Sequence, residues 1–360
     1  MKIKLKLPAT SHALIFICSL FTLPSAFGQG ALTPPGPPAA TMVTLSQLQL
    51  QSRTPISSVP ITITQPGSYY LVSNLVCTVS NAIVITANGV TLDLNGFTLS
   101  STVANAANGG AAILLNTSLT ISDITICNGH IVGGVTNNGS NVYSGSGFGY
   151  GIYCPGFSPV NVLVSHVTVS GCLDDGIYVY NEIGSTLVES CTVSTIGNYG
   201  IAAYTVNQSS AIDCAEDAIY SNQASDCVGE STFHGYGIDA IYQARDCYGY
   251  TALGYAGINA SVAHDCYGYN AGSNYGIFAD FALNCDGTSG TGDGVWADDA
   301  ENSFGDSSGS GYGLYAQYTA SGCSGASYSG TGLDAFIASV CHGISNTGTP
   351  LAATHNVNSY

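Results

Sequence analysis

The pattern of apolar and polar residues predicts short strands along most of this chain. Residues 61–64 alternate as Ile-Thr-Ile-Thr, and residues 90–94 place Val90, Leu92 and Leu94 on one face. This period of two is typical of a strand with one buried face. Glycine supplies 45 of the 360 residues, which is too many for long helices. The sequence therefore predicts an all-β protein.

An internal repeat of about 19 residues governs the second half of the chain. The phrase Gly-apolar-x-small recurs, with Ala218 once in place of the glycine. A β-solenoid explains such a repeat, because each repeat forms one coil and equivalent residues stack ~4.8 Å apart. The apolar column comprises Ile201, Ile219, Ile238, Ile258, Ile277, Val295, Leu314 and Leu333. A second column comprises Cys227, Cys247, Cys266, Cys285, Phe304, Cys323 and Cys341, most with Ala three residues earlier.

Two segments carry a resemblance to a known group. Residues 67–71 and 89–99, together with the Gly-Ile coils after residue 149, resemble the right-handed parallel β-helix repeat proteins of the pectin-lyase-like group, in its secreted bacterial type. The resemblance implies a right-handed parallel β-helix and covers most of residues 60–345. That group contains lyases, glycoside hydrolases, epimerases, tailspikes and adhesins, so the fold does not determine the activity.

The N-terminal residues have the pattern of a secretory signal peptide. Lys2, Lys4 and Lys6 precede an apolar run over 13–23, and small residues favour cleavage before Gln29. We expect a secreted or cell-surface protein, with the periplasm as the alternative and no membrane insertion after cleavage. The expected organisation is a signal peptide at 1–28, a Pro-rich leader and N-terminal cap at 29–57, the β-helix at 58–345 and a C-terminal tail at 346–360.

Charge then narrows the choice of partners. Without the first 28 residues the chain has Arg53 and Arg245 as its basic residues against 22 acidic ones, and it has no lysine. Such an acidic surface repels nucleic acids, anionic membranes and polyuronates. The sequence thus excludes a nucleic-acid binder and disfavours enzymes that act on uronate chains.

One pair of carboxylates suggests hydrolytic chemistry. Asp174 and Asp175 precede a Gly-Ile pair and resemble the paired aspartates of the β-helix polygalacturonases, which implies a general acid and a base. The Gly-His-Gly and Arg-x-Lys motifs of that family are absent from this sequence. Asp-Gly-Ile is also an ordinary coil corner, and we favour that structural interpretation.

Arg245 is the second catalytic candidate. Lyases of the group resemble one another in using an Arg or Lys base, and Arg245 is the basic residue inside the repeats. Stacking predicts that Arg245 lies beside His264 and that Asp246 lies beside Asp265. Neutralisation of the stacked aspartates is the alternative role, and the one we favour.

A column of acidic residues directly precedes the cysteines. Calcium takes oxygen ligands, so Asp226, Asp246 and Asp265 are candidate Ca²⁺ ligands, and solvated acidic turns are the alternative. No cofactor is otherwise expected. A second acidic cluster comprises Asp298, Asp299, Glu301 and Asp306.

Cysteines and tyrosines complete the candidate residues. A spacing of ~4.8 Å lies within the Cα range of disulfides, so neighbouring cysteines either form bridges or a ladder of free thiols. Tyr248 and Tyr267, like Tyr250 and Tyr269, are expected to stack, as part of the wall or as a surface for sugar rings. The candidate disulfide cysteines are Cys227, Cys247, Cys266, Cys285, Cys323 and Cys341.

These observations predict a secreted acidic β-helix with a non-catalytic binding, adhesive or structural role. A polysaccharide or cell-surface glycan is the expected partner. The alternative is a polysaccharide-degrading or -modifying enzyme of the same fold. A third interpretation is self-association through the open ends of the solenoid.

Overall fold

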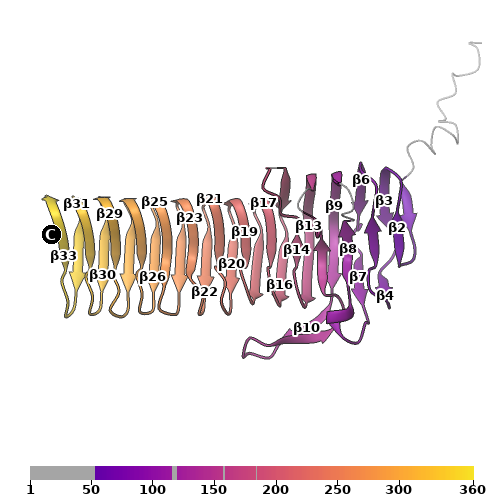
Figure 1. The fold of residues 1–360 in the computed structure, drawn as a ribbon, viewed down its shortest axis with the longest axis horizontal. Helices are drawn as coiled ribbons and strands as arrows, with labels where there is room; N and C mark the ends of the chain where they lie inside the picture. Colours follow the sequence, from indigo (N-terminus) through magenta and orange to yellow (C-terminus); the bar gives the residue numbers. More distant parts are fainter. Residues whose placement is uncertain (1–52, 116–119, 157–158, 184) are drawn as a thin grey trace, which may run out of the picture. The chain divides into compact units, whose positions relative to one another are not determined.

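The computed structural model describes residues 53–115, 120–156, 159–183 and 185–360, which form a parallel β-solenoid of about 16 turns (Figure 1). Thirty-one strands belong to one continuous sheet. Strands account for 59% of the residues and helix for 1%, so the predicted all-β solenoid with coils of about 19 residues is confirmed. Among the described residues, no helix has the length and apolarity to cross a membrane.

The first coils are irregular and contain most of the variation in strand length. They comprise β1 (Thr54–Ile56), β2 (Ile61–Ile63), β3 (Gly67–Leu71), β4 (Leu75–Cys77), β5 (Ile83–Ile85), β6 (Val90–Asp93), β7 (Thr98–Ser101), the 3₁₀ helix η1 (Ala106–Asn108), β8 (Ala111–Leu115), β9 (Ser122–Val132), β10 (Gly134–Asn137), β11 (Tyr143–Ser146), β12 (Tyr150–Tyr153), β13 (Val160–Cys172), β14 (Ile177–Tyr178), β15 (Thr186–Glu189) and β16 (Thr192–Ile196).

The later coils repeat one long strand and one short strand. They comprise β17 (Ile201–Asn207), β18 (Ser210–Cys214), β19 (Ile219–Ser225), β20 (Val228–Ser231), β21 (Ile238–Arg245), β22 (Tyr248–Thr251), β23 (Ala256–His264), β24 (Tyr267–Asn270), β25 (Tyr275–Leu283), β26 (Asp286–Ser289), β27 (Val295–Glu301), β28 (Phe304–Ser307), β29 (Leu314–Ser321), β30 (Ser324–Ser327), β31 (Leu333–Ser339), β32 (His342–Ser345) and β33 (Leu351–Val357).

Three ladders of parallel strands form the walls. The first ladder carries the Gly-apolar phrase and runs from β2 through β14 to β17. The second runs from β1 to β15 and joins the first in β17, so that each later long strand bends across both walls. The third contains the short strands from β18 to β32.

The apolar column forms the core, as predicted. Ile201 pairs in register with Ile219, and the register continues coil by coil to Leu333 and Leu351. Every member from Ile201 to Leu333 is fully buried. Each fully buried aliphatic side chain stabilises the fold by about 1.5–3 kcal/mol relative to exposure, so this column is a main source of the solenoid's stability.

The cysteine column contains Ser303, so its predicted assignment to Phe304 is wrong. Phe304 pairs with Asp286 and Ser324 and is 40% exposed, whereas Ser303 is 2% exposed. The Ser303 hydroxyl accepts a hydrogen bond from the Cys285 amide at 3.1 Å and donates to the Glu301 carbonyl at 3.0 Å. A serine thus takes the cysteine's place at the same corner, because both side chains are small and can donate to that carbonyl.

A second buried column is polar, and the sequence analysis did not predict it. Thr251 Oγ1 donates to the Gly235 carbonyl and accepts from the Gly254 amide, both at 2.9 Å. Ser289 makes the equivalent pair of bonds two coils further along. These side chains hold a tight turn and satisfy backbone groups that the core would otherwise leave unpaired. The column comprises Ser231, Thr251, Asn270, Ser289, Ser307, Ser327 and the partly exposed Ser345. Among the described residues, the Ser231 and Ser307 hydroxyls make no such bond.

The solenoid extends beyond the limits of 58 and 345 expected from the sequence. At its start, β1 pairs with β3. At its other end, β33 pairs in parallel with β31, and Leu351 continues the apolar column where Pro350 replaces the repeat's glycine. Residues 346–360 therefore close a further coil rather than form a tail. The predicted signal peptide and most of the leader lie outside the described residues.

An antiparallel hairpin of β10 and β11 interrupts the coils (Figure 1). The Tyr143 hydroxyl donates to Asp213 Oδ1 at 2.8 Å and lies 2.8 Å from Thr232 Oγ1. Asn137 Nδ2 donates to the same Asp213 oxygen at 2.8 Å. The hairpin is therefore attached to two coils that follow much later in the sequence.

Candidate functional site

Asp174 and Asp175 lie in a cleft of about 340 Å³ on the first ladder, beyond the end of β13. The structure surrounds the two aspartates with aromatic rings from three successive coils. We call this the aspartate–tyrosine cleft. Its lining residues are Tyr150, Tyr153, Pro155, Gly156, Asp174, Asp175, Tyr178, Tyr180, Asn198 and Tyr199.

Asp175 is the more buried carboxylate of the pair, with 5% of its surface exposed. Its Oδ1 accepts hydrogen bonds from Asn198 Nδ2 at 2.7 Å and from the Tyr199 amide at 3.3 Å. Burial raises the pKa of Asp175 to about 6, against these two hydrogen bonds and with a smaller contribution from Asp174. Near neutral pH this carboxyl group exchanges protons readily.

Asp174 is partly exposed and borders the same cleft. Burial raises its pKa, and the adjacent Tyr150 hydroxyl lowers it. Burial and Asp174 together raise the pKa of Tyr150 to about 12, so Tyr150 keeps its proton. The cleft thus contains two neighbouring carboxyl groups of different environments, which is the arrangement that acid–base chemistry uses.

Tyrosine rings form a continuous cluster around these carboxylates. The centroids of Tyr150 and Tyr153 are 4.0 Å apart with nearly parallel planes, and Tyr153 lies 5.9 Å from Tyr178. The cluster continues from Tyr178 to Tyr199 at 6.3 Å and to Tyr220 at 6.0 Å. Aromatic surface beside hydrogen-bonding groups is typical of ligand clefts.

The Asp175 hydrogen bond to Tyr199 is part of a recurring corner. Asp217 Oδ1 accepts from the Tyr236 amide at 2.8 Å, and Asp293 Oδ1 accepts from the Tyr312 amide at 2.8 Å. Each of these aspartates directly precedes the Gly or Ala of the repeat phrase. Because the same bond recurs at Asp217 and Asp293, which do not line the cleft, the bond of Asp175 holds the corner of the coil. Within the part of the chain that the structure describes, Asp174 makes no such corner bond.

Two columns extend the site along the solenoid, and most of their residues are partly exposed, whereas Asp175, Ala202 and Ala256 are buried. One column holds the residue before the Gly or Ala of each repeat phrase, and the other holds the residue after its apolar member. We call these columns the flanking strip. Its residue pairs are Tyr150/Tyr153, Asp175/Tyr178, Tyr199/Ala202, Asp217/Tyr220, Tyr236/Asp239, Ala256/Asn259, Tyr275/Phe278, Asp293/Trp296, Tyr312/Tyr315 and Thr331/Asp334.

The sequence contains a signal for this strip beside the apolar column of the repeat. Tyr or Asp recurs directly before the phrase, and an aromatic residue or Asp recurs as its third residue. The third residue of the phrase faces outward because it directly follows the inward apolar residue on a strand. The residue before the glycine lies in most coils in the turn that precedes the strand, and it stacks with its equivalents there. The same stacking rule that predicted the core therefore also predicts the strip.

Arg245 does not join Asp174 and Asp175. It pairs in register with His264, as predicted, and its Nε lies 3.2 Å from Asp246 Oδ2. The side chain is 58% exposed, and it lies three coils from the cleft, or ~14 Å along the axis. The geometry fits neutralisation of an aspartate rather than a shared catalytic site.

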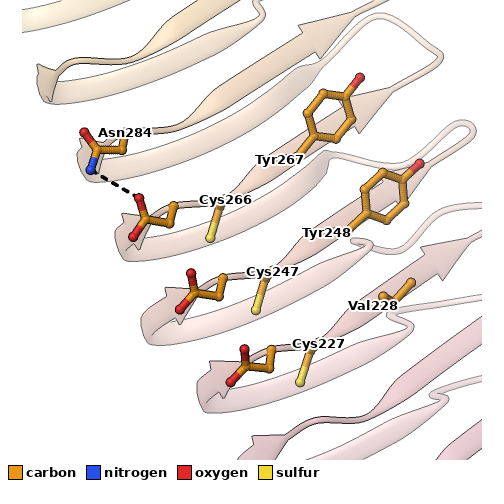
Figure 2. A pocket seen from close by; sticks show the side chains of 10 residues that line it. Cys227, Val228, Cys247, Tyr248, Cys266, Tyr267 and Asn284 are labelled. Carbon is orange, nitrogen blue, oxygen red and sulfur yellow. Dashed lines mark hydrogen bonds between the residues drawn. The ribbon is translucent and has the colours of Figure 1, made fainter.

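The acidic column lines a second, larger hollow of about 640 Å³ on another wall (Figure 2). Its corner residues Asp226, Asp246 and Asp265 have φ values of 52°, 51° and 54°. This left-handed conformation favours Asp and Asn over other non-glycine residues. The same corner holds Asn284, Asn302, Gly322, Val340 and Asn358, all with positive φ, and Val340 is the exception to this preference.

Asp246 and Asp265 of this column have protein partners. Asp246 faces Arg245, Asp265 Oδ2 lies 2.7 Å from His264 Nδ1, and Asp265 Oδ1 accepts from Asn284 Nδ2 at 3.2 Å. Within the described ranges, no group of three or more His, Cys, Asp or Glu side chains is arranged to hold a metal ion. Backbone conformation accounts for the column, and its binding of Ca²⁺ stays a prediction.

The cysteines of the hollow are free thiols in the structure (Figure 2). Figure 2 shows Cys227, Cys247 and Cys266 in a row, with Tyr248 and Tyr267 on the strands that follow. The Cys247 thiol donates to the Arg245 carbonyl at 3.0 Å, and the thiols on either side together with burial raise its pKa. Of the two alternatives for the six predicted cysteines, the structure holds the thiol ladder.

The tyrosines beside this hollow stack as predicted. The rings of Tyr248 and Tyr267 are 5.5 Å apart with an angle of 3° between their planes, and Tyr250 and Tyr269 are also 5.5 Å apart. The stacking supports the wall of the third ladder.

Aromatic rings and two unlike carboxyl groups come together in the aspartate–tyrosine cleft, which is therefore the strongest candidate site. Comparison of the chain with protein-family models, curated proteins and solved structures finds no match.

Proposed function

We propose that this protein binds polysaccharide or cell-surface glycan chains outside the cytoplasm, through the aspartate–tyrosine cleft. The observation that carries the proposal is the cluster of Tyr150, Tyr153, Tyr178 and Tyr199 around two carboxyl groups. Rings provide apolar surface for the C–H groups of a sugar, and carboxylates and tyrosine hydroxyls pair with its hydroxyl groups.

The test is a binding panel of neutral, anionic and cationic polysaccharides, measured by calorimetry or by sedimentation with insoluble polymers. The double variant Tyr153→Ala, Tyr178→Ala removes two rings of the cleft and is expected to abolish most of the binding. The matched control is Tyr248→Ala, Tyr267→Ala, which removes a stacked pair on another wall. Equal loss in both double variants, or binding by neither the native protein nor any variant, would contradict the proposal.

Catalysis in the same cleft is the second candidate function. The raised pKa of Asp175, about 6, beside Asp174 favours it. A protonated Asp175 would act as the acid, and Asp174 as the base that activates water. Product release from the panel, with and without Ca²⁺, tests this function in the native protein and in the Asp174→Asn, Asp175→Asn double variant. The control Asp293→Asn removes an aspartate with the same backbone bond outside the cleft.

We further propose that the solenoid winds right-handed, belongs to the pectin-lyase-like group and is secreted. The resemblance of residues 67–71 and 89–99 supports the first two proposals, and the pattern of residues 1–28 supports export. An experimental structure would give the hand. Detection of the chain outside the cytoplasm, starting at Gln29, would support export, and retention of the first 28 residues would contradict it.

A further inference from the structure

A second group of aromatic rings occupies the flanking strip far from the cleft. Phe278 and Trp296 stack at 4.6 Å with 13° between their planes, and Trp296 lies 5.8 Å from Tyr315. Tyr275 packs against Phe278 at 5.0 Å, and Tyr312 against Tyr315 at 5.2 Å. We call these five residues the Trp296 cluster. All five side chains are partly exposed.

The cleft and the Trp296 cluster belong to the same two columns. Register pairs connect Tyr153 and Tyr178 to Tyr220, and continue to Trp296 and Tyr315. Tyr153 and Tyr315 are eight coils apart, which corresponds to ~38 Å along the axis. The two aromatic groups therefore face the same side of the solenoid as parts of one straight path.

The interval between the two groups holds Tyr236 and the buried Ala256 in one column and a polar pair in the other. Asn259 Nδ2 donates to Asp239 Oδ1 at 2.7 Å, and both residues are partly exposed. These two residues occupy the column that holds aromatic rings elsewhere. The path thus offers clusters of rings at both ends and, between them, Tyr236 beside a hydrogen-bonded polar pair.

We propose that the flanking strip binds one linear, uncharged polysaccharide chain lengthwise, with the Trp296 cluster as its second contact region. This inference rests on the proposed function and deepens it, because it specifies the class of glycan and the length of chain. A polymer that reaches both aromatic groups gains the second contact at a high effective concentration, whereas a short fragment cannot.

Charge selects the class of chain. The acidic protein repels anionic polymers. The strip's Asp217 and Asp293 accept hydrogen bonds from the Tyr236 and Tyr312 amides. Each of these aspartates thus gives one oxygen to the backbone, and burial raises the pKa of both. Burial therefore disfavours the charged form that a cationic chain would pair with. An uncharged chain can contact the rings and hydroxyl groups of the strip, and its binding does not carry the free-energy cost of removing an ion from water.

The sole tryptophan of the protein provides a direct reporter, because Trp296 belongs to the second contact region. Soluble mixed-linkage glucan, xylan and mannan are titrated against the native protein, in parallel with the disaccharides of each polymer. Calorimetry measures binding anywhere on the protein, and Trp296 fluorescence measures contact at the cluster. The expected result is that a bound polymer changes the fluorescence, whereas its disaccharide binds without changing it.

Variants test the second contact separately. Trp296→Ala is expected to weaken polymer binding roughly tenfold and to leave disaccharide binding unchanged. Phe278→Leu retains the fluorophore and a similar apolar volume while removing a ring, and it is expected to weaken polymer binding in the same direction. Tyr267→Leu is the matched control on another wall. Thermal melting confirms that each variant is folded.

The outcomes separate this inference from the proposed function. Polymer binding without any change in Trp296 fluorescence, or with native affinity in Trp296→Ala, overturns the lengthwise path and leaves binding at the cleft intact. No heat of binding with any glycan overturns the proposed function and this inference with it. Tighter binding of a cationic or anionic polymer than of the neutral ones overturns the assignment to an uncharged chain.

Discussion

Replacement of Asp217 by Asn should stabilise the protein at high pH and have little effect at low pH. Asp217 is largely buried, and its Oδ1 accepts a hydrogen bond from the Tyr236 amide. Burial raises its pKa to about 7, with smaller contributions from Asp239 and Glu216. Asparagine keeps the accepting oxygen and the shape of the side chain but carries no charge.

The magnitude follows from the difference in proton affinity. The pKa of this carboxyl group is raised from 3.8 to about 7 on folding, which corresponds to about 4 kcal/mol. Because the folded-state pKa is the higher one, the folded protein binds the proton more tightly than the unfolded chain. Stability therefore increases as pH falls from about 7 toward 4, and the cost of the buried charge is fully present above pH 7.

Calorimetric melting at about pH 8 and about pH 4 measures this effect. Asp217→Asn should melt roughly 6 °C above the native protein at the higher pH, and close to it at the lower pH. The exposed Asp280→Asn variant is the control for the general effect of removing a negative charge. An equal shift of Asp217→Asn at both pH values, or a loss of stability at pH 8, would refute the reasoning.

Three further predictions concern the corners and the core. Cys266→Ser should leave the melting temperature nearly unchanged, since Ser303 makes the equivalent bonds, whereas Cys266→Val should lower it because valine cannot donate to the carbonyl. Gly268→Ala should destabilise the fold by about 3 kcal/mol in chemical denaturation, because a Cβ there would lie 2.2 Å from the Gly276 carbonyl oxygen. Removal of Ca²⁺ with a chelator should leave the melting curve unchanged, because Asp246 already faces Arg245. A calcium site would be shown instead if added Ca²⁺ raised the melting temperature and the Asp246→Asn variant abolished this rise.

The core could be predicted from the sequence because residues that lie one repeat apart contact each other in a solenoid. Ile201 contacts Ile219 for no other reason than that they occupy equivalent places in successive coils. The same rule correctly placed Arg245 beside His264. It failed at Phe304, because the period alone does not distinguish a corner serine from the residue that follows it, and the bonds of Ser303 decide the register.

The cleft could be predicted only in part. The sequence indicated Asp174 and Asp175 as a candidate pair, but the partners that define their chemistry, Asn198 and Tyr199, belong to the next coil. Their contribution depends on burial, which residue types alone do not give. The aspartates before the cysteines were interpreted through charge, whereas the left-handed backbone at Asp246 is a property of the folded corner.

The coils differ in length at one bend without disturbing the columns on either side. In β21 and again in β29 one extra residue lies between the alanine of the repeat phrase and the next paired residue, and the register recovers in the following coil. Tyr242 and Tyr318 lie in these bulges and are 53% and 51% exposed. A short peptide grafted at this bend would be displayed at the surface while the stacking beneath it stays in phase, so the bend is a natural place to add new recognition elements to the protein.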